Sequence, residues 1–173
     1  MIGLGDESCQ HTNVNTSRIW SFGKPRVKKN TTKSEKVNSI GFYALNGNSV
    51  YKSKDSNKKE DVARFLYEIR KENPEKTIIL IWDNARTHWS RLVRATAQLL
   101  NIILVFLPPY SPDLNPIEFI WKSIKKELSS MFLMCKEEVR DSVDQMFYEF
   151  SSSLSFAKSW MRKFLKPLHI ELC

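Results

Sequence analysis

The sequence predicts an α/β fold with a mixed sheet, and three observations support this. First, VNSIGFYAL (37–45) and NSVYKS (48–53) flank Asn46-Gly47, the dipeptide typical of a type I′ hairpin turn, which needs positive φ at both central residues. Second, the apolar runs TIILIWD (77–83) and 102–107 are separated by a helical pattern, and a strand–helix–strand order indicates a parallel pair. Third, apolar residues at helical spacing recur after residue 116.

The N-terminal half supplies the antiparallel part of the predicted sheet. MIGLGDES (1–8) is a weak pattern for a short strand that ends at Asp6. Residues 9–36 are polar and basic, which indicates a loop with a short strand at 19–22. After the hairpin, apolar residues at helical spacing predict a helix over 58–72, capped by Ser56 or Asn57 and ended by Pro74.

The C-terminal half supplies the parallel strands and most of the helices. TIILIWD is continuously apolar and β-branched, as expected of a strand buried on both faces. A helix is predicted over 86–100, and a strand over 102–107 that Pro108-Pro109 stops. Further helices are predicted over 117–128, 137–150 and 154–165.

Composition limits the class of protein. The 173 residues are enough for one domain with a real core. Twenty-seven Lys and Arg against 19 Asp and Glu give a net charge of +8, which favours a polyanionic partner, although many basic proteins bind none. Three scattered cysteines without a CxxC pair indicate no zinc site and a reducing environment. Without a signal peptide or a bilayer-length apolar run, we expect a soluble protein with no membrane partner, in the cytoplasm or nucleoid, or in a eukaryotic nucleus.

Three acids lie where strands end or a helix begins: Asp6, Asp83 and Glu118. Each also has a structural interpretation. Asn115-Pro116-Ile117-Glu118 fits a capping box, in which Asn115 is the N-cap and Glu118 reaches back to its amide. Asp83 and Asp6 could each turn the chain through an Asx motif.

Two acidic motifs have 34 residues (84–117) between their acids, with Asp83 in WDNARTH (82–88) and Glu118 in LPPYSPDLNPIEFIWKSIK (107–125). These motifs and their spacing closely resemble the mariner-like insertion-sequence transposases, a class of DDE endonucleases. The resemblance continues upstream. Asp6-Glu7-Ser8 is similar to the family's first acidic strand end, WSFGKPRV (20–27) to its tryptophan-glycine-basic stretch, and VNSIGFYALNG to its second strand. It covers 1–128, about three quarters of the chain.

This resemblance implies a ribonuclease-H-like fold of the retroviral-integrase superfamily, with a mixed five-stranded sheet flanked by helices. It also implies DNA cleavage at transposon ends, strand transfer to target DNA, and two Mg²⁺ or Mn²⁺ ions, with Asp6 bridging both and Asp83 and Glu118 each holding one. The chemistry is consistent, because converging carboxylates repel one another unless cations neutralise them, and two ions about 4 Å apart can stabilise a phosphoryl transfer.

Other residues near the motifs could support such a site. Asn84 could bond a neighbouring carboxylate, Arg86 and His88 could orient a metal shell or a phosphate, and Asn115 could fix the helix start; packing on a helix surface is an equal alternative. Asp113 is a rival third acid, but the family motif favours Glu118. Basic residues that could contact DNA, or simply be solvated, are Lys24, Arg26, Lys28, Lys29, Lys122, Lys125 and Lys126.

Family members usually carry an N-terminal helix-turn-helix module that recognises transposon ends, and only five residues precede Asp6. We therefore expect a shortened first strand, with a separately encoded helix-turn-helix subunit as a possible partner and a homodimer as the active complex. Two other functions stay open. One is a catalytically inactive or partial transposase-derived module that binds DNA or assembles complexes, and the other is a repair or ribonuclease-H-type nuclease.

Overall fold

The computed structural model describes residues 1–12, 22–23, 34–54, 56 and 58–168. The strand predicted over 19–22 lies outside these residues except for Phe22, which is in a bend. The predicted DNA-contacting residues Lys24, Arg26, Lys28 and Lys29 also lie outside them.

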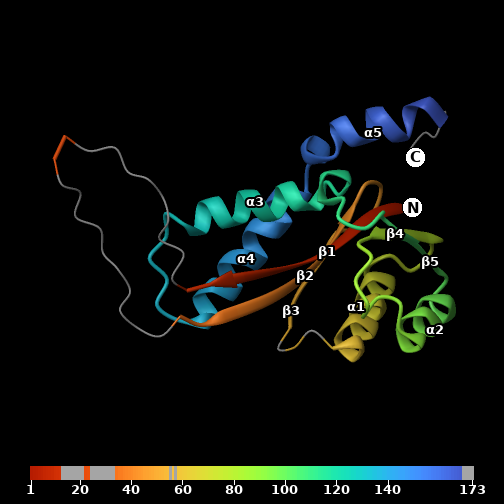
Figure 1. The fold of residues 1–173 in the computed structure, drawn as a ribbon, viewed down its shortest axis with the longest axis horizontal. Coiled ribbons are helices and arrows are strands. Elements are labelled where there is room, and N and C mark those ends of the chain that lie inside the picture. The colour runs from red at the N-terminus through yellow and green to blue at the C-terminus, as the bar shows by residue number, and fades with distance from the viewer. Residues whose placement is uncertain (13–21, 24–33, 55, 57, 169–173) are drawn as a thin grey trace.

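The sheet has five strands in the order β3-β2-β1-β4-β5. Strands β1 (Ile2–His11), β2 (Lys36–Ala44) and β3 (Val50–Lys54) are antiparallel neighbours. Strands β4 (Ile78–Trp82) and β5 (Ile102–Phe106) run parallel to β1 (Figure 1). The predicted mixed five-stranded sheet, with its antiparallel portion followed by parallel βα units, is therefore confirmed.

Strand β1 does not end at Asp6, as the sequence pattern suggested, but continues to His11. The reason is its pairing with β2, which extends from Gly3↔Ala44 to His11↔Lys36. Its parallel pairing with β4 covers only Ile2 to Leu4. Beyond Leu4 the strand therefore has one neighbour, and its other edge is open toward the ends of β4 and β5.

The β2–β3 hairpin is confirmed, but its predicted type I′ turn is wrong. Residues 45–49 connect the strands, and neither Asn46 nor Gly47 has positive φ. Contacts with the end of the following helix hold this longer loop instead: the backbone N–H of Asn48 donates to Asn73 Oδ1 at 2.8 Å, and Asn48 Nδ2 donates to the Glu72 carbonyl at 2.8 Å.

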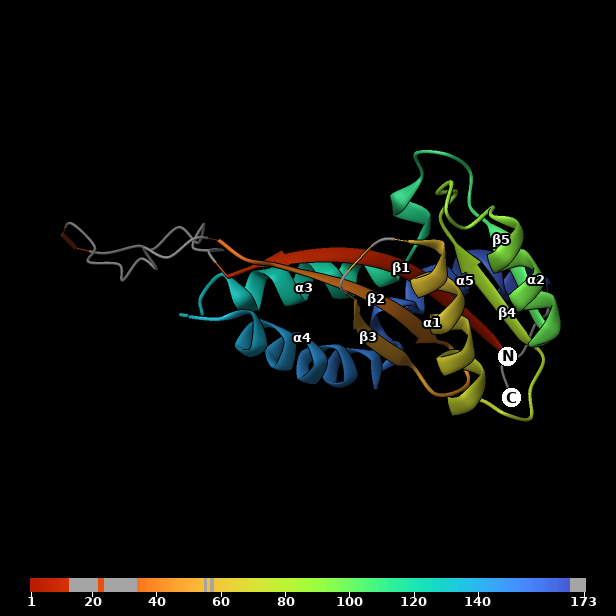
Figure 2. The ribbon, with the colours of Figure 1, turned by 90° about the horizontal axis from the view of Figure 1, so that it is seen from below.

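Helices cover both faces of the sheet (Figure 2). Helices α1 (Lys59–Glu72) and α2 (Arg91–Leu99) pack on one face through a core that includes Phe65, Leu80 and Trp82. On the other face, α3 (Ile117–Leu128) and α4 (Lys136–Ser151) enclose a second core around Trp121 and Phe147. No helix among the described residues is long and apolar enough to cross a membrane.

The ends of several helices differ from the sequence prediction. Helix α1 has Lys58 at its N-cap position and no side-chain cap. Of the two predicted caps, Ser56 donates its hydroxyl hydrogen to Asp61, and Asn57 lies outside the described residues. Helix α2 begins at Arg91 rather than at 86, since Ser90 caps it by accepting from Val93 N. The segment predicted as one helix over 154–165 is a 3₁₀ turn, η2 (Leu154–Phe156), followed by α5 (Lys158–Phe164); two further 3₁₀ turns are η1 (Pro112–Leu114) and η3 (Lys166–Leu168).

Candidate active site

A cavity of about 440 Å³ lies where β4 and β5 end against β1 and the start of α3. All three predicted acids, Asp6, Asp83 and Glu118, line it. The rival acid Asp113 is exposed on η1 and does not line it. The other lining residues are Asn84, Ala85, Leu107, Pro108, Pro109, Tyr110, Ser111, Pro112 and Asn115.

Strand register brings Asp6 and Asp83 to the same edge of the sheet. Leu4 lies opposite Ile81 in the parallel pair, so two residues further along each strand are Asp6 and Asp83. Gly5 permits this close approach, because a Cβ at Gly5 would lie 2.8 Å from Trp82 Cε3. Gly5, which lies between Leu4 and Asp6, therefore lets Trp82 pack directly across β1.

A hydrogen bond between α3 and β1 positions the third acid. The Asn115 side chain is 2% exposed and donates from Nδ2 to the Gly5 carbonyl at 3.0 Å. The predicted capping box is therefore wrong: Pro116 occupies the N-cap position, and no side chain caps the helix. Glu118 N still donates to the Asn115 carbonyl at 3.1 Å, so the residue that binds Gly5 also starts the turn that carries Glu118.

Asp6 carries the largest electrostatic cost in the cavity. It is 9% exposed, and burial, together with the nearby negative charge of Glu118, raises its pKa from 3.8 to about 8. Asp83 and Glu7 raise the pKa further, while a hydrogen bond from the Glu7 backbone opposes the shift. At neutral pH the cavity therefore favours a proton, or another positive charge, on Asp6.

Asp83 is held by a buried histidine. His88 is 1% exposed, and its Nδ1 lies 2.7 Å from Asp83 Oδ1. This hydrogen bond lowers the pKa of Asp83 despite partial burial of the carboxylate. Burial alone would lower the pKa of His88, but its interactions with Asp83 and Glu7 raise it.

The chain of polar contacts continues from His88 to β3. His88 Nε2 lies 3.8 Å from Glu7 Oε1, and Glu7 also accepts from the buried Lys54 ammonium. Sequence reasoning identified neither Glu7 nor Lys54 as a site residue. Because successive side chains of a strand point to opposite faces, the sequence of β1 could have predicted that Glu7 and Asp6 lie on different faces. Nothing in the sequence predicts that Lys54 lies beside Glu7.

Of the other two predicted supporting residues, Asn84 lines the cavity and Arg86 does not. The Asn84 side chain accepts from Trp89 Nε1 rather than bonding a carboxylate, and Arg86 is exposed and does not line the cavity. Neither residue lies in a helix: Asn84 is in the irregular segment after β4, and Arg86 is in a turn over 86–89 before α2. Two of the predicted supporting residues contact the segments that carry the acids: His88 bonds to Asp83, and Asn115 bonds to the Gly5 carbonyl beside Asp6.

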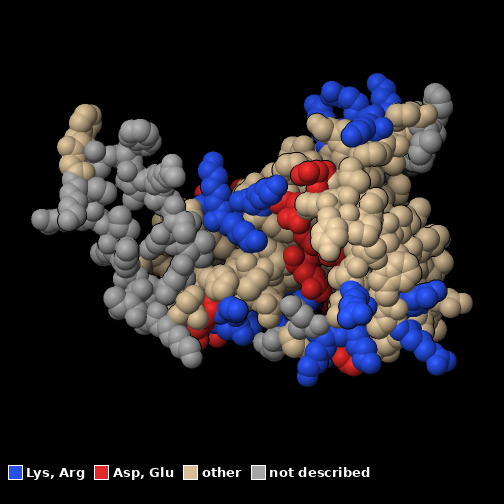
Figure 3. Space-filling model, viewed as in Figure 1, with Lys and Arg blue, Asp and Glu red and all other residues tan. Residues whose placement is uncertain are grey.

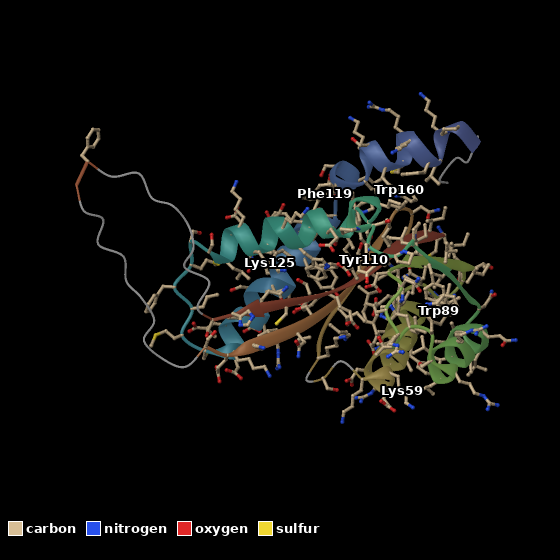
Figure 4. The ribbon with its side chains drawn as sticks, viewed as in Figure 1. Lys59, Trp89, Tyr110, Phe119, Lys125 and Trp160 are labelled. Carbon is tan, nitrogen blue, oxygen red and sulfur yellow. The ribbon has the colours of Figure 1, made fainter. Side chains whose placement is uncertain are left out.

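Three predicted DNA-contacting lysines, Lys122, Lys125 and Lys126, are exposed on α3. They line a groove of about 510 Å³ with Gln10, His11 and other residues at the far end of β1. Figure 3 shows acidic side chains in a band down the middle of this face, with basic side chains on either side of it. Lys125 is labelled on α3 in Figure 4.

Among the described residues, no three His, Cys, Asp or Glu side chains are arranged to hold a metal ion. Asp6, Asp83 and Glu118 therefore share one cavity without forming a closed ligand cluster. The Asp83 carboxylate bonds to His88 instead.

Solved structures similar to this chain include those of Mos1 mariner transposase. The paired-end complex with Mg superposes with a TM-score of 0.69 at 18% identity, covering 95% of this chain and 55% of that chain. The strand transfer complex gives a TM-score of 0.68 at 19% identity, covering 97% and 52%. The Mos1 catalytic domain gives 0.62 at 18% identity, covering 95% and 81%.

These similarities show a ribonuclease-H-like transposase catalytic fold. The chain spans about half the length of the Mos1 chains in the complexes. No curated protein sequence matches it. The sequence profile described as DDE superfamily endonuclease matches residues 2–140. The chain therefore belongs to the DDE superfamily of endonucleases.

Proposed function

We propose that this chain is the catalytic domain of a DNA transposase that cuts DNA at transposon ends and joins the freed 3′-OH to target DNA. One observation carries the proposal: three carboxylates from β1, the end of β4 and the start of α3 line a single cavity. Asp6, Asp83 and Glu118 are far apart in sequence, and a different local contact places each of them at the cavity. The register of β1 and β4 places Asp6, and a hydrogen bond to His88 holds Asp83. The hydrogen bond from Asn115 to Gly5 positions the start of α3, which carries Glu118.

The chemistry of the cavity lining suits divalent metal ions. Its donor set is carboxylate oxygen, the ligand that Mg²⁺ and Mn²⁺ prefer. Burial and, after it, the negative charge of Glu118 raise the pKa of Asp6; a bound cation would favour its ionised form. Asn115 Oδ1 is also buried and has no hydrogen-bond partner among the described residues. We propose that Asp6, Asp83 and Glu118 hold Mg²⁺ or Mn²⁺; the similar Mos1 structures include complexes with Mg and with Mn.

Bound metal would supply Lewis-acid stabilisation of the attacking and leaving oxygens. The protein's own residues orient the ligands. Hydrogen bonding to His88 restrains Asp83, so its carboxylate loses less rotamer freedom on binding a ligand. The Asn115–Gly5 hydrogen bond fixes the distance between β1 and α3, and therefore between Asp6 and Glu118. The carboxyl group of Asp6 must release its proton before it can coordinate, which binding of a cation favours.

DNA is the proposed partner. The net charge of +8 and the lysines of α3 provide positive charge beside the acidic cavity. The similar Mos1 structures include a paired-end complex with the left transposon end. By analogy, we propose that two copies of this chain act together. Recognition of the end sequence would come from a helix-turn-helix segment or subunit.

The test is nicking of a supercoiled plasmid that carries the element's ends. The wild-type protein is expected to nick it with Mn²⁺ or Mg²⁺ and not with EDTA, and Glu118→Gln should abolish nicking. Asp113→Asn is a matched control, because this acid is five residues away and outside the cavity. Equal nicking by wild type and Glu118→Gln would refute the proposed role of the cavity.

A second candidate is a transposase-derived module that binds DNA without cutting it. The absence of a closed group of metal ligands among the residues that the structure describes favours it. This alternative predicts salt-sensitive DNA binding, no nicking in Mn²⁺, and binding unaltered by Glu118→Gln.

A further inference from the structure

Tyr110 stands out among the residues that line the cavity. It lies between β5 and η1, and its relative exposure of 103% is far above that of an ordinary surface aromatic. It nevertheless lines the same cavity as the three acids; Figure 4 labels Tyr110. A large ring left in water beside a polar site contributes nothing to the core.

The backbone at Tyr110 is also unusual. Its φ is +58°, a left-handed conformation that bulky L residues rarely adopt. The flanking segment restricts relaxation, because Pro108, Pro109 and Pro112 fix their own φ angles. The fold therefore keeps the chain in a strained shape that points the ring away from the protein.

Hydrogen bonds hold this loop at both ends. Leu107 N donates to the Trp82 carbonyl at 2.9 Å, and Asn115 N donates to the Pro112 carbonyl at 2.9 Å. Between them, the Ser111 hydroxyl donates to the Pro109 carbonyl at 3.3 Å. The ring is thus presented by a segment tied to β4 on one side and to the start of α3 on the other.

Other exposed aromatics around the site have neighbours. Trp89 stacks on Phe106 with ring centroids 4.2 Å apart. The Lys122 ammonium lies 5.3 Å from the centroid of the Phe119 ring. Among the described residues, Tyr110 has no such ring or cation contact, so both faces of its ring are available to a ligand.

We propose that Tyr110 stacks on an unpaired nucleobase next to the phosphodiester that the acids hold, an inference that rests on the proposed function. Bases are the flat, apolar groups nearest to a phosphodiester, and stacking on an aromatic side chain tolerates any base. A base inside a duplex has both faces covered by its neighbours. Tyr110 therefore selects DNA whose bases beside the cut are unpaired or unstacked, such as a frayed end or a strand junction.

Fluorescence of 2-aminopurine tests the stacking directly. The probe is a DNA duplex with a short single-stranded overhang, in which 2-aminopurine occupies each overhang position in turn. The full chain is added with Ca²⁺ so that binding is observed without relying on cleavage. The wild-type protein is expected to quench the probe at one or more positions, because a stacked 2-aminopurine loses its fluorescence.

Substitutions then assign the quenching to Tyr110. Tyr110→Ala should remove it and weaken binding of the overhang DNA about fivefold or more relative to blunt duplex. Tyr110→Phe should behave as wild type, because the ring and not the hydroxyl stacks. Tyr67→Ala is the matched control, since Tyr67 is an exposed tyrosine on α1, on the other face of the sheet.

Tyr110→Gly separates a binding role from a structural one. Glycine accepts φ of +58° without strain, so this variant should have an unchanged or higher Tm and yet lose the quenching. A fall in Tm with Tyr110→Gly would indicate instead that the ring stabilises the fold, and would overturn the inference.

The outcomes also separate this inference from the proposed function. Quenching that depends on Tyr110, without any nicking in Mn²⁺, would support the inference while the proposed function fails. Nicking by the wild type with no quenching at any position would overturn the inference and leave the proposed function standing. Equal quenching by wild type and Tyr110→Ala would also overturn it.

Discussion

Replacing Asp6 by asparagine should stabilise the metal-free protein, although Asp6 is at the centre of the proposed site. In the folded chain its pKa is about 8, against an ordinary value of 3.8. At pH 7 the unfolded chain has Asp6 ionised, whereas the folded chain holds it mostly protonated. Folding must therefore take up a proton, and the free energy of unfolding falls as pH rises from about 4 to about 8.

The size of the effect follows from the shift. Each pH unit between 3.8 and 7 costs about 1.4 kcal/mol, so at pH 7 the cost is at most about 4 kcal/mol. Asparagine has nearly the same shape and cannot ionise, so Asp6→Asn removes this cost. We expect a gain of about 2 kcal/mol or more, which for a chain of this size raises Tm by roughly 4–8 °C.

Thermal unfolding in EDTA, followed by circular dichroism from pH 4 to pH 8, measures this. The difference in Tm between Asp6→Asn and wild type should be near zero at pH 4 and grow with pH. Adding Mn²⁺ should raise the Tm of the wild type only, because binding to the folded state stabilises it. A destabilised Asp6→Asn, or a Tm difference that does not change with pH, would refute the reasoning.

Three further predictions concern the residues around the acids. Asn115→Ala should cost about 1–3 kcal/mol of stability in urea unfolding, because it leaves the buried Gly5 carbonyl unpaired, and it should reduce nicking; unchanged stability would contradict the proposed link. His88→Gln should raise the Mn²⁺ concentration needed for half-maximal nicking severalfold, since Asp83 loses its restraint; an unaltered Mn²⁺ dependence would count against that role. Lys122, Lys125 and Lys126 should contact the DNA backbone. Replacing all three by glutamine should lower the slope of log K for DNA binding against log salt concentration by up to about 3, and should leave the Mn²⁺ dependence of nicking unchanged. An unchanged slope would show that these lysines are not in the DNA interface.

The parts of the site that sequence could predict are those carried by local motifs. The WDNARTH and LPPYSPDLNPIE segments pointed to Asp83 and Glu118, which share one cavity, and favoured Glu118 over Asp113, which does not line it. Asp6 was found through the order of motifs, but the strand end predicted there was wrong, because the length of β1 depends on its pairing with β2. Local pattern alone contains no information on how far a partner strand extends.

Tertiary contacts also determine hydrogen-bond partners and loop conformations that local sequence patterns do not predict. Asn115 satisfies every sequence criterion for an N-cap, yet its amide donates across to Gly5 because the two segments pack there. Asn46-Gly47 is a strong type I′ signal, yet contacts with α1 determine the loop. Lys54 reaches Glu7 only because β3 and β1 both flank β2.

The proposed function requires that Asp6, Asp83 and Glu118 together hold two divalent ions. Electron paramagnetic resonance during a Mn²⁺ titration of the protein–DNA complex measures this directly. The account predicts about two bound ions per cavity with magnetic coupling between them, loss of that coupling in Glu118→Gln, and an unchanged spectrum in Asp113→Asn. A wild-type complex that binds no Mn²⁺, or a Glu118→Gln complex that binds it as the wild type does, would contradict the account.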